Sequence, residues 1–485
     1  MNGYCCQNGH QSFGLNFSME ATGYKVFNDS VHGHITLHPL LVKVVDTPQF
    51  QRLRNIKQLG FANYVFPGAN NCRYEHSLGT CYLAGKMVEK LLSRESGPRS
   101  NEDKFKMTLC VQLAALCHDL GHGPFSHTWE RITETWGYDW KHESASIQMF
   151  DYLVKENNLH EEFRKYNLGE EEIKIIKELI IGGPDENKKP LLANKDNFFY
   201  EIVSNKNTGI DVDRWDYFLR DGLHLNLRIT FDYRRLLEFS TILYDDDGLT
   251  HINFRDKEML NLYDMYRVRS ALHYAAYRHK VVINIEQMCI DAFKAAGDAG
   301  YKINNSETLL KEAHLAPESF STLTDHVFYD ILYSRDERLS AAQQLLQRVL
   351  KRDLYKFVGS INFPISKRLS KKEQKECIEK EKSKVLSELE NDCKGSQFSV
   401  EDFYLYLDST SDPVANVKFY KKTGEETIEK ETFENIKNRL APFPFQLSED
   451  RTAQLLVFCK NQDVKKNHLE KAENFVKQYK TQCIV

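Results

Sequence analysis

The sequence predicts a mainly helical protein with a smaller C-terminal α+β lobe. Helical patterns of apolar residues dominate as far as about residue 360, and three short strand-like runs follow. The chain has 485 residues, which is too many for one compact core, and 41% of them are hydrophobic. We therefore expect a disordered tail at residues 1–22, a helical domain at 23–360 and the α+β lobe at 361–485.

Several segments carry the helical signal of the first domain. Thr47 is followed by proline, which suits the first position of a helix, and apolar residues then recur at helical spacing. Residues 76–92 hold an apolar stripe of the same period. Residues 107–117 are apolar on nearly every side, so the sequence predicts a buried helix there. Helical patterns continue at 211–221 and 257–296.

The predicted C-terminal lobe differs in amino-acid composition from the helical domain. Residues 366–384 mix lysine and glutamate densely, which is typical of a solvated helix face or a mobile arm. Strand-like runs follow at Phe403–Leu407, Val417–Tyr420 and Leu455–Cys459.

Composition narrows the class of protein. The formal net charge is −4, so the chain lacks the overall positive charge that is typical of nucleic-acid-binding proteins, although local basic pockets remain possible. Its eleven cysteines include no CxxC pair, and no apolar run approaches the length of a membrane span. We expect a reduced intracellular protein of the nucleus or cytoplasm, with no membrane partner.

The sharpest local feature is the pair His118-Asp119 at the end of the buried helix. The segment Leu-Gly-His-Gly-Pro-Phe-Ser-His follows at once, and its glycines and proline end the helix there. Such a pair alone also fits a helix-end carboxylate beside a hydrogen-bonded imidazole. However, His76 opens an upstream helix and Asp213 lies in a downstream one. Two imidazoles and two carboxylates suit Zn, Fe, Mn, Ni or Mg and leave positions open for water and phosphate, unlike a structural zinc site.

Longer segments carry a resemblance to a known family. RYEHSLG, LCHDLGHGPFSH and GIDVDRWDYFLRD resemble the HD phosphohydrolase superfamily. KVFNDSVHGHITLHPLLVKVVDTPQFQRLRNIKQLG, FRDKEMLNLYDM and YRHKV closely resemble the vertebrate deoxynucleoside triphosphate (dNTP) triphosphohydrolases that contain SAM and HD domains. The likeness begins near Tyr24 and becomes loose after about residue 360. Because only about 23 residues precede it, we expect a short form or paralogue without the SAM module.

The resemblance implies a metal-dependent enzyme with an HD-domain helical core. Activated water would attack the α-phosphorus and release a deoxynucleoside and intact triphosphate. The leaving oxygen needs a proton, and an imidazole suits that role near pH 7. His127 and His122 are the candidates, and the match favours His127. His142 matches a third family histidine, although a histidine between lysine and glutamate is also often simply solvated.

Ten positions match the family's substrate-contacting residues, and they are Gln58, Leu59, Arg73, Arg214, Tyr217, Asp221, Arg269, His273, Tyr277 and Arg278. The arginines at 73, 214 and 269 would bind phosphates. Two positions depart from the family, which usually has lysine at 214 and glutamine at 278. The change at 214 keeps the charge but alters its geometry, and a cation at 278 could change base tolerance or point to solvent.

Sugar selection is implied for one face of the helix around Asp213. Tyr217 and Asp221 follow it at steps of four residues, so the three share a face, which is also compatible with an ordinary polar stripe. By resemblance, Gln58 and Asp221 would hold the 3′-hydroxyl. Tyr217 and Leu59 would crowd the 2′ position and exclude ribonucleotides.

Regulatory positions of the family are also matched. Those of a guanine-nucleotide site for GTP or dGTP are Lys25, Val26, Asp46, Gln51, Arg54, Arg352 and Lys356. Those of an adjacent dNTP effector site are Asn28, Val65, Arg235, Arg255, Lys257, Asn261, His279, Lys280 and Lys422. Each alone also fits a solvated charge or, for Asp46, a carboxylate at a helix start. Together they imply an allosteric enzyme that assembles as a homotetramer.

Two alternatives remain open from the sequence. The same ligand set serves other HD enzymes, which hydrolyse nucleoside monophosphates or cyclic nucleotides, and product analysis separates these. A non-catalytic, nucleotide-gated oligomer that binds single-stranded nucleic acid is the second, and it predicts salt-sensitive binding without turnover.

Overall fold

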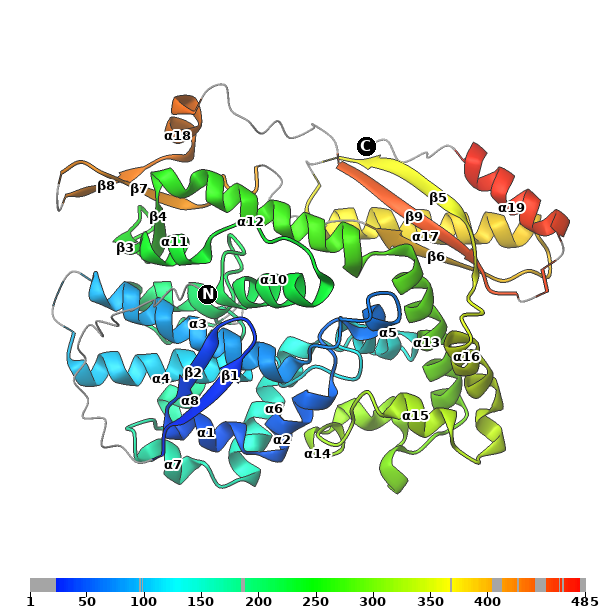
Figure 1. Ribbon diagram of the computed structural model, residues 1–485, viewed down its shortest axis with the longest axis horizontal. Coiled ribbons are helices and arrows are strands. Elements are labelled where there is room, and N and C mark those ends of the chain that lie inside the picture. Colours follow the sequence, from blue (N-terminus) through cyan, green and yellow to red (C-terminus); the bar gives the residue numbers. More distant parts are fainter. Residues whose placement is uncertain are drawn as a thin grey trace, which may run out of the picture.

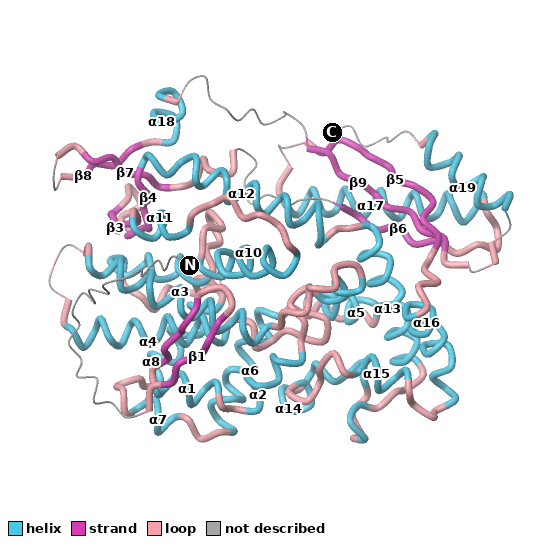
Figure 2. Tube along the Cα trace, viewed as in Figure 1, coloured by secondary structure: helices cyan, strands magenta, loops and turns pink. Residues whose placement is uncertain are grey.

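The computed structural model of the protein describes residues 23–95, 97, 99–184, 188–366, 369–403, 412–424, 427–440, 451–461, 463, 464 and 466–479. It is mainly helical, as the sequence predicts, with small sheets on the outside of the helical body (Figures 1 and 2). The expected tail at 1–22 lies outside the described residues. Within the described part, no helix is both long and apolar enough to span a bilayer.

The helical body is built from elements between residues 39 and 350. Its helices are α1 (Pro39–Val45), α2 (Pro48–Gln51), α3 (Arg73–Ser93), α4 (Asn101–Cys117), α5 (His127–Thr135), α6 (His142–Glu156), α7 (His160–Arg164), α8 (Glu170–Ile180), α9 (Tyr200–Val203), α10 (Val212–Leu225), α11 (Tyr233–Glu238), α12 (Met259–Leu272), α13 (Lys280–Asp298), α14 (Pro317–Phe320), α15 (Val327–Leu332) and α16 (Ser340–Leu350). A π-helical turn at His273–Tyr277 continues α12.

Helices α3 and α4 pack together at the centre of this body. The predicted burial of 107–117 is confirmed, because Leu109, Leu113 and Leu116 on α4 are almost fully inaccessible to solvent. Each such side chain favours folding by about 1.5–3 kcal/mol when it leaves water. The helix ends at Cys117, and Gly121 then passes so close to α6 that a Cβ there would lie 2.2 Å from Ser146 N. This close approach explains a glycine in the motif.

Two hairpins interrupt the helical body and were not predicted. β1 (Lys25–Asp29) pairs with β2 (Gly33–Leu37), and β3 (Ser240–Tyr244) pairs with β4 (Thr250–Arg255), both antiparallel. The strands are short, and β1 is exposed along most of its length, so its sequence shows no clear alternation. The first hairpin lies across the front of the body in Figure 1.

Part of the C-terminal region joins the helical body. β7 (Lys418–Lys422) pairs in parallel with β4, and β8 (Ile428–Glu431) extends the same sheet to four strands. Helix α18 (Phe433–Arg439) follows, and Phe419, Phe433 and Ile436 pack into the core of the body. The division at residue 361 stays a prediction, but the described part of this segment packs into the core of the helical body.

The remaining C-terminal elements form a lobe with its own core. β5 (Lys356–Ile365), β9 (Arg451–Cys459) and β6 (Phe398–Phe403) make an antiparallel sheet in that order, and α17 (Lys371–Asp392) and α19 (Lys466–Gln478) pack on it. Figure 1 shows this lobe above α5 and α13.

The predicted lobe elements compare with the structure as follows. The lysine- and glutamate-rich segment is helical, as α17, and two predicted strands are confirmed as β7 and β9. The predicted strand at 403–407 meets β6 at Phe403, and its remaining residues lie outside the described part.

A buried polar cluster joins the first hairpin to the helices. Asp216 on α10 is fully buried and accepts hydrogen bonds from His32 Nε2 and His76 Nδ1, each at 2.7 Å. The guanidinium of Arg220 binds the same carboxylate and also Asp29 of β1 at 2.9 Å. On α3, a Cβ at position 79 would lie 1.9 Å from Asp216 Oδ1, so Gly79 is required by this approach.

Replacing Gly79 with alanine therefore tests the cluster. Alanine normally stabilises a helix by up to about 1 kcal/mol relative to glycine. Here we expect Gly79→Ala to lower the free energy of unfolding by about 1–3 kcal/mol, the usual cost of overpacking. Denaturant titration followed by circular dichroism measures this.

Gly85→Ala is the matched control on the same helix. A Cβ there meets the flexible end of Gln112, which can move aside. The control should leave stability unchanged or raise it. Equal stability of both variants would contradict the proposed role of Gly79.

Candidate metal centre and nucleotide cavity

Three helices bring the four predicted metal ligands together. His76 lies in the first turn of α3, His118 and Asp119 directly follow α4, and Asp213 lies in the first turn of α10. His76 Nε2 is 3.0 Å from Asp213 Oδ1 and 3.5 Å from Asp119 Oδ2. His118 Nε2 is 3.4 Å from a carboxylate oxygen of each aspartate. The predicted set therefore converges on one point, although its members are up to 137 residues apart.

Hydrogen bonds orient both imidazoles toward that point. His76 Nδ1 donates to Asp216, and His118 Nδ1 donates to Ala115 O at 2.8 Å. Each ring then presents the lone pair of Nε2 to the carboxylates, and neither Nε2 atom makes a well-directed hydrogen bond with the described residues. Buried nitrogen and oxygen donors without such partners are what a divalent cation needs, so the four residues fit a metal ion.

The charges at this point lead to the same conclusion. Burial alone would lower the pKa of His76, but the adjacent carboxylates of Asp213 and Asp216 raise it to about 10. Burial likewise opposes ionisation of Asp213, yet the two imidazoles hold its pKa below the usual range. The carboxylates thus demand positive charge between them, which a cation supplies when the imidazoles are neutral.

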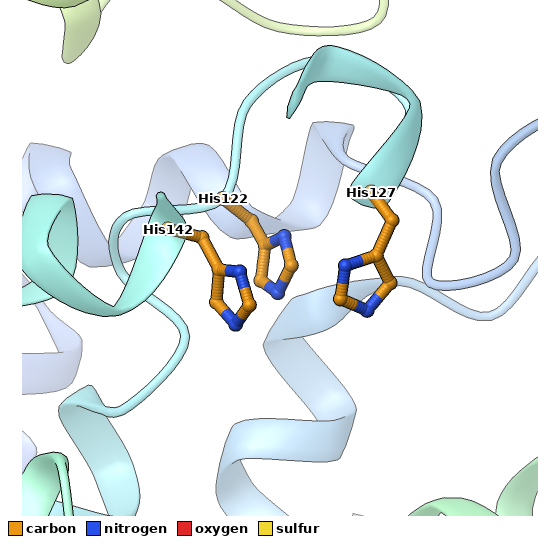
Figure 3. Close-up of side chains that lie close together, drawn as sticks. All are labelled: His122, His127 and His142. Atoms are coloured by element: carbon orange, nitrogen blue, oxygen red, sulfur yellow. The ribbon is translucent and has the colours of Figure 1, made fainter. Parts of the chain in front are cut away.

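Three further histidines form a second group, shown in Figure 3. The rings of His122 and His142 stack with centroids 4.0 Å apart, and the ring of His127 lies 4.9 Å and 5.1 Å from them. Glu130 accepts from His142 Nδ1 at 2.6 Å and from His127 Nδ1 at 3.3 Å. His122 is buried against Asp119, whereas the side chain of His127 is 68% exposed. The group links to the metal ligands through His122 and reaches the surface at His127.

A cavity of about 1000 Å³ opens beside both groups. All ten predicted substrate-contacting residues line it, and so do His122, His127, His142, Asp119 and Asp213. A volume of this size accommodates a nucleotide. The structure thus places these positions around one space, while their individual roles stay predictions.

Two rows of side chains run along the cavity. The α10 row consists of Asp213, Tyr217 and Asp221, and the α12 row consists of Arg269, His273 and Tyr277. Both rows use steps of four residues, so each lies on one helix face. Tyr277 Oη donates to Asp221 Oδ2 at 2.6 Å and ties the far ends of the rows together.

The loop before α5 is strained and firmly held. Phe125 and Ser126 have positive φ angles of 58° and 59°, which cost side-chain-bearing residues about 1–3 kcal/mol each. Arg73 Nε donates to Ser126 Oγ at 2.9 Å, and the Phe125 amide donates to Asp325 Oδ1 at 2.6 Å. Arg73 also binds the ligand Asp119 at 2.7 Å. This loop places His127 at the cavity.

The predicted regulatory residues fall into several surface groups. Lys25 pairs with Asp46 at 2.9 Å, and Arg54 donates to Gln51 and stacks on Tyr74, so these positions meet near α2, next to the exposed Val26. Arg352 donates to the Tyr64 carbonyl, beside Val65, and Lys356 begins β5. Figure 1 shows α2 and α16 on separate parts of the molecule. One chain therefore does not gather the whole predicted guanine-nucleotide set.

Apart from Val65, the other predicted effector residues lie on or next to helices α11, α12 and α13 and on strands β1, β4 and β7. Arg235 pairs with Glu258, which also accepts from Asn261. The remaining positions are Asn28 on β1, Arg255 on β4, Lys257 before α12, His279 and Lys280 at the start of α13, and Lys422 at the end of β7. The pairing of β4 with β7 brings the segments of Arg255 and Lys422 together.

Several functional contacts were not predicted. Asp216 and Glu130 orient imidazoles, but a carboxylate that binds a ring leaves no distinctive sequence spacing. Arg52 is buried and donates to the carbonyls of Leu120 and His122 at 3.2 Å and 2.7 Å, so it supports the motif loop from a distant segment. The cavity is also lined by residues of the lobe, among them Lys382 and Asp402. Only the fold reveals these.

Comparisons with known proteins agree with the geometry. The HD domain family matches residues 73–220, which include all four ligands. The chain is 41% identical to deoxynucleoside triphosphate triphosphohydrolase SAMHD1 of Bos taurus over 91% of this chain and 76% of that protein. For the Homo sapiens protein the identity is 42%, over 91% and 71%. For the SAMHD1 homolog of Dictyostelium discoideum it is 34%, over 90% and 78%.

Removal of the carboxylate behind His76 tests the proposed metal centre. Partners of this kind fix the ring and raise its basicity, so Asp216→Asn should weaken metal binding by roughly 10–100-fold. His118→Ala, which removes a ligand, should lose the metal. Dialysis against graded chelator, followed by elemental analysis of the folded protein, measures both.

Asp151→Asn is the control, because Asp151 is an exposed aspartate paired with Lys177 at the surface. It should retain metal like the unmodified protein. Full metal content in folded His118→Ala protein would refute the ligand assignment.

Proposed function

The chain belongs to the SAMHD1 family of deoxynucleoside triphosphate triphosphohydrolases, and from that premise we propose that it cleaves dNTPs to deoxynucleoside and intact triphosphate. One observation carries the proposal. The converging His76, His118, Asp119 and Asp213 open into a cavity lined by every substrate position expected from the sequence.

A divalent cation held by His76, His118, Asp119 and Asp213 would lower the pKa of a bound water and neutralise phosphate charge. The donor set leaves Zn, Fe, Mn and Mg as candidates. The protein's part is to fix the ligands, through Asp216 and the Ala115 carbonyl, and to keep the site buried.

The substrate would lie along the two rows. Arg73, Arg214 and Arg269 line the cavity and would bind the triphosphate. The linked Asp221 and Tyr277 line the cavity and would meet the sugar, where Asp221 and Gln58 would hold the 3′-hydroxyl. Leu59 and Tyr217 would form an apolar wall against a 2′-hydroxyl.

His127 is the proposed acid for the leaving oxygen. It lines the cavity, and its Nδ1 is held by Glu130, which leaves Nε2 to face a substrate. Hydrogen bonds to His127 and His142 keep the pKa of Glu130 below its usual range, although burial opposes this. Glu130 accepts from Nδ1 of both rings and so fixes how they face the cavity, where general acid catalysis needs a positioned proton donor.

Regulation by nucleotides is the second part of the proposal. The residues near α2 and those near α16 would contact one GTP or dGTP molecule only when they come from different chains. Such a ligand favours the assembled form by mass action, and we propose a homotetramer with dNTPs in the neighbouring effector positions. An enzyme of the nucleus or cytoplasm, where dNTPs are found, is consistent with this.

The sugar wall gives a first test. The unmodified protein should convert dGTP to deoxyguanosine and triphosphate and leave GTP intact, because Tyr217 excludes the 2′-hydroxyl. Tyr217→Ala should reduce the difference in activation free energy between GTP and dGTP hydrolysis by roughly 1–3 kcal/mol. Chromatography of the products measures both, with exposed Tyr244→Ala as control. Release of monophosphate or pyrophosphate would contradict the reaction class.

Assembly gives a second test. GTP should shift the protein toward a tetramer and raise dNTP hydrolysis. Asp46→Ala should weaken GTP affinity by roughly 1–3 kcal/mol, since guanine donors lose their acceptor, while its surface pair with Lys25 adds little to stability. Light scattering and activity over a GTP titration measure this.

Asp336→Ala serves as the control for assembly, because the Asp336 carboxylate pairs with its surface neighbour Arg338, away from the predicted guanine-nucleotide residues in the sequence. It should respond to GTP like the unmodified protein. Full activity without guanine nucleotide, together with a molecular mass that GTP does not change, would refute regulation by assembly.

A further inference from the structure

The two rows give the cavity a direction. Each runs over eight residue steps, or about 12 Å at the rise of an α-helix. The α10 row starts at the metal ligand Asp213, and Tyr217 in its middle lies within electrostatic reach of Arg269, where the α12 row starts. The far ends are joined by the bond between Tyr277 and Asp221. A nucleotide with its phosphates at the metal must therefore place its base beyond that bond.

Arg278 occupies this far end. It follows Tyr277 directly, where the π-helical turn ends, and its side chain lines the cavity. Its main-chain amide donates to His273 O at 2.9 Å, so the end of the α12 row fixes its backbone. The residue is thus held at the base end rather than at the phosphates.

The C-terminal lobe holds the guanidinium. Arg278 Nη1 donates to the main-chain carbonyl of Asp402 on β6 at 3.3 Å. The carboxylate of Asp402 is itself paired with Lys382 on α17 at 3.2 Å. Burial would raise the pKa of Asp402, but Lys382 and Arg278 keep it below the usual range, so the carboxylate stays ionised. A residue of the lobe therefore sets where the Arg278 donors point.

A second contact fixes the lobe strand itself. Arg131 on α5 binds Glu401, the neighbour of Asp402, at 2.6 Å. The same guanidinium binds Glu286 on α13 at 2.9 Å. Because α5 and α13 belong to the body, β6 is tied to the body at the residue next to the carbonyl that accepts from Arg278.

A guanidinium offers donors only, in fixed directions, and this limits the bases it suits. Guanine O6 and thymine O4 accept hydrogen bonds, whereas the amino groups at the corresponding positions of adenine and cytosine are donors; N7 accepts in both purines and does not separate them. We propose that Arg278, oriented by the C-terminal lobe, makes the base end of the cavity favour keto bases, so that dGTP and dTTP are preferred over dATP and dCTP. This specificity rests on the proposed function.

A competition experiment tests the preference without interference from effector sites. An equimolar mixture of the four dNTPs is incubated with the protein and saturating GTP, and early depletion of each is followed by chromatography. All substrates then share one effector state, so the depletion ratios report relative kcat/KM. We expect dGTP and dTTP to be consumed faster by about fivefold, the size of one net hydrogen bond.

Variants separate the parts of the argument. Arg278→Gln supplies an amide that both donates and accepts, and should bring the four rates to within about twofold. Lys382→Met frees the Asp402 carboxylate to neutralise Arg278, and should reduce the preference in the same direction. Arg267→Gln on α12 and Lys380→Met on α17 are exposed controls that should keep it.

The outcomes distinguish the two proposals. Equal consumption of all four dNTPs by the unmodified protein, or a preference that survives Arg278→Gln, would overturn the base preference and leave the proposed function intact. If the base preference changes in Arg278→Gln but not in Lys382→Met, the C-terminal lobe does not orient Arg278. If no dNTP is consumed and no triphosphate appears, both proposals fail.

Discussion

The carboxylate of Asp216 is the constraint on which the metal centre depends. It is fully buried, and an isolated charge there would cost several kcal/mol. Two imidazoles and the guanidinium of Arg220 satisfy both of its oxygens. One of those imidazoles is His76. The hydrogen bond that satisfies the Asp216 carboxylate therefore also orients a metal ligand. Loss of any partner would leave a buried charge and a misdirected ring together.

The same cluster explains why the first hairpin belongs to the catalytic body. His32 follows β1 and reaches Asp216, while Asp29 of that strand binds Arg220. The hairpin thus closes the cluster from outside and excludes water. On the opposite side, Arg52 and Asp325 bind backbone groups of the loop between α4 and α5. Segments far apart in sequence therefore hold the two halves of the site.

The sequence predicted what local patterns determine. The end of a buried helix at His118 follows from apolar residues before it and glycines after it, and the structure agrees. Around Asp213 the pattern was less decisive, because three aspartates lie within six residues. Asp211 caps α10, Asp213 faces the other ligands and Asp216 orients His76, and only the helix direction separates these roles.

Elsewhere, the pairing of strands that lie far apart in the sequence could not be predicted. β4 and β7 pair in parallel although about 165 residues separate them, and nothing in either segment specifies its partner. This pairing crosses the expected division at residue 361, and local patterns give no sign of it. The register of β6 is likewise set by its partner β9 rather than by its own alternation.

The two ends of the cavity differ in how firmly they are held. The pairs around Asp216 have no solvent exposure, whereas Arg131 is 30% exposed and Lys382 is 20% exposed. Water screens such partly exposed pairs, so the contacts between the lobe and the body are weaker than the pairs around Asp216. Moving one partner at the metal end would leave a buried charge without its counterion. The metal ligands therefore rest on the more rigid frame, and a sequence change at the proposed base end can occur without disturbing them.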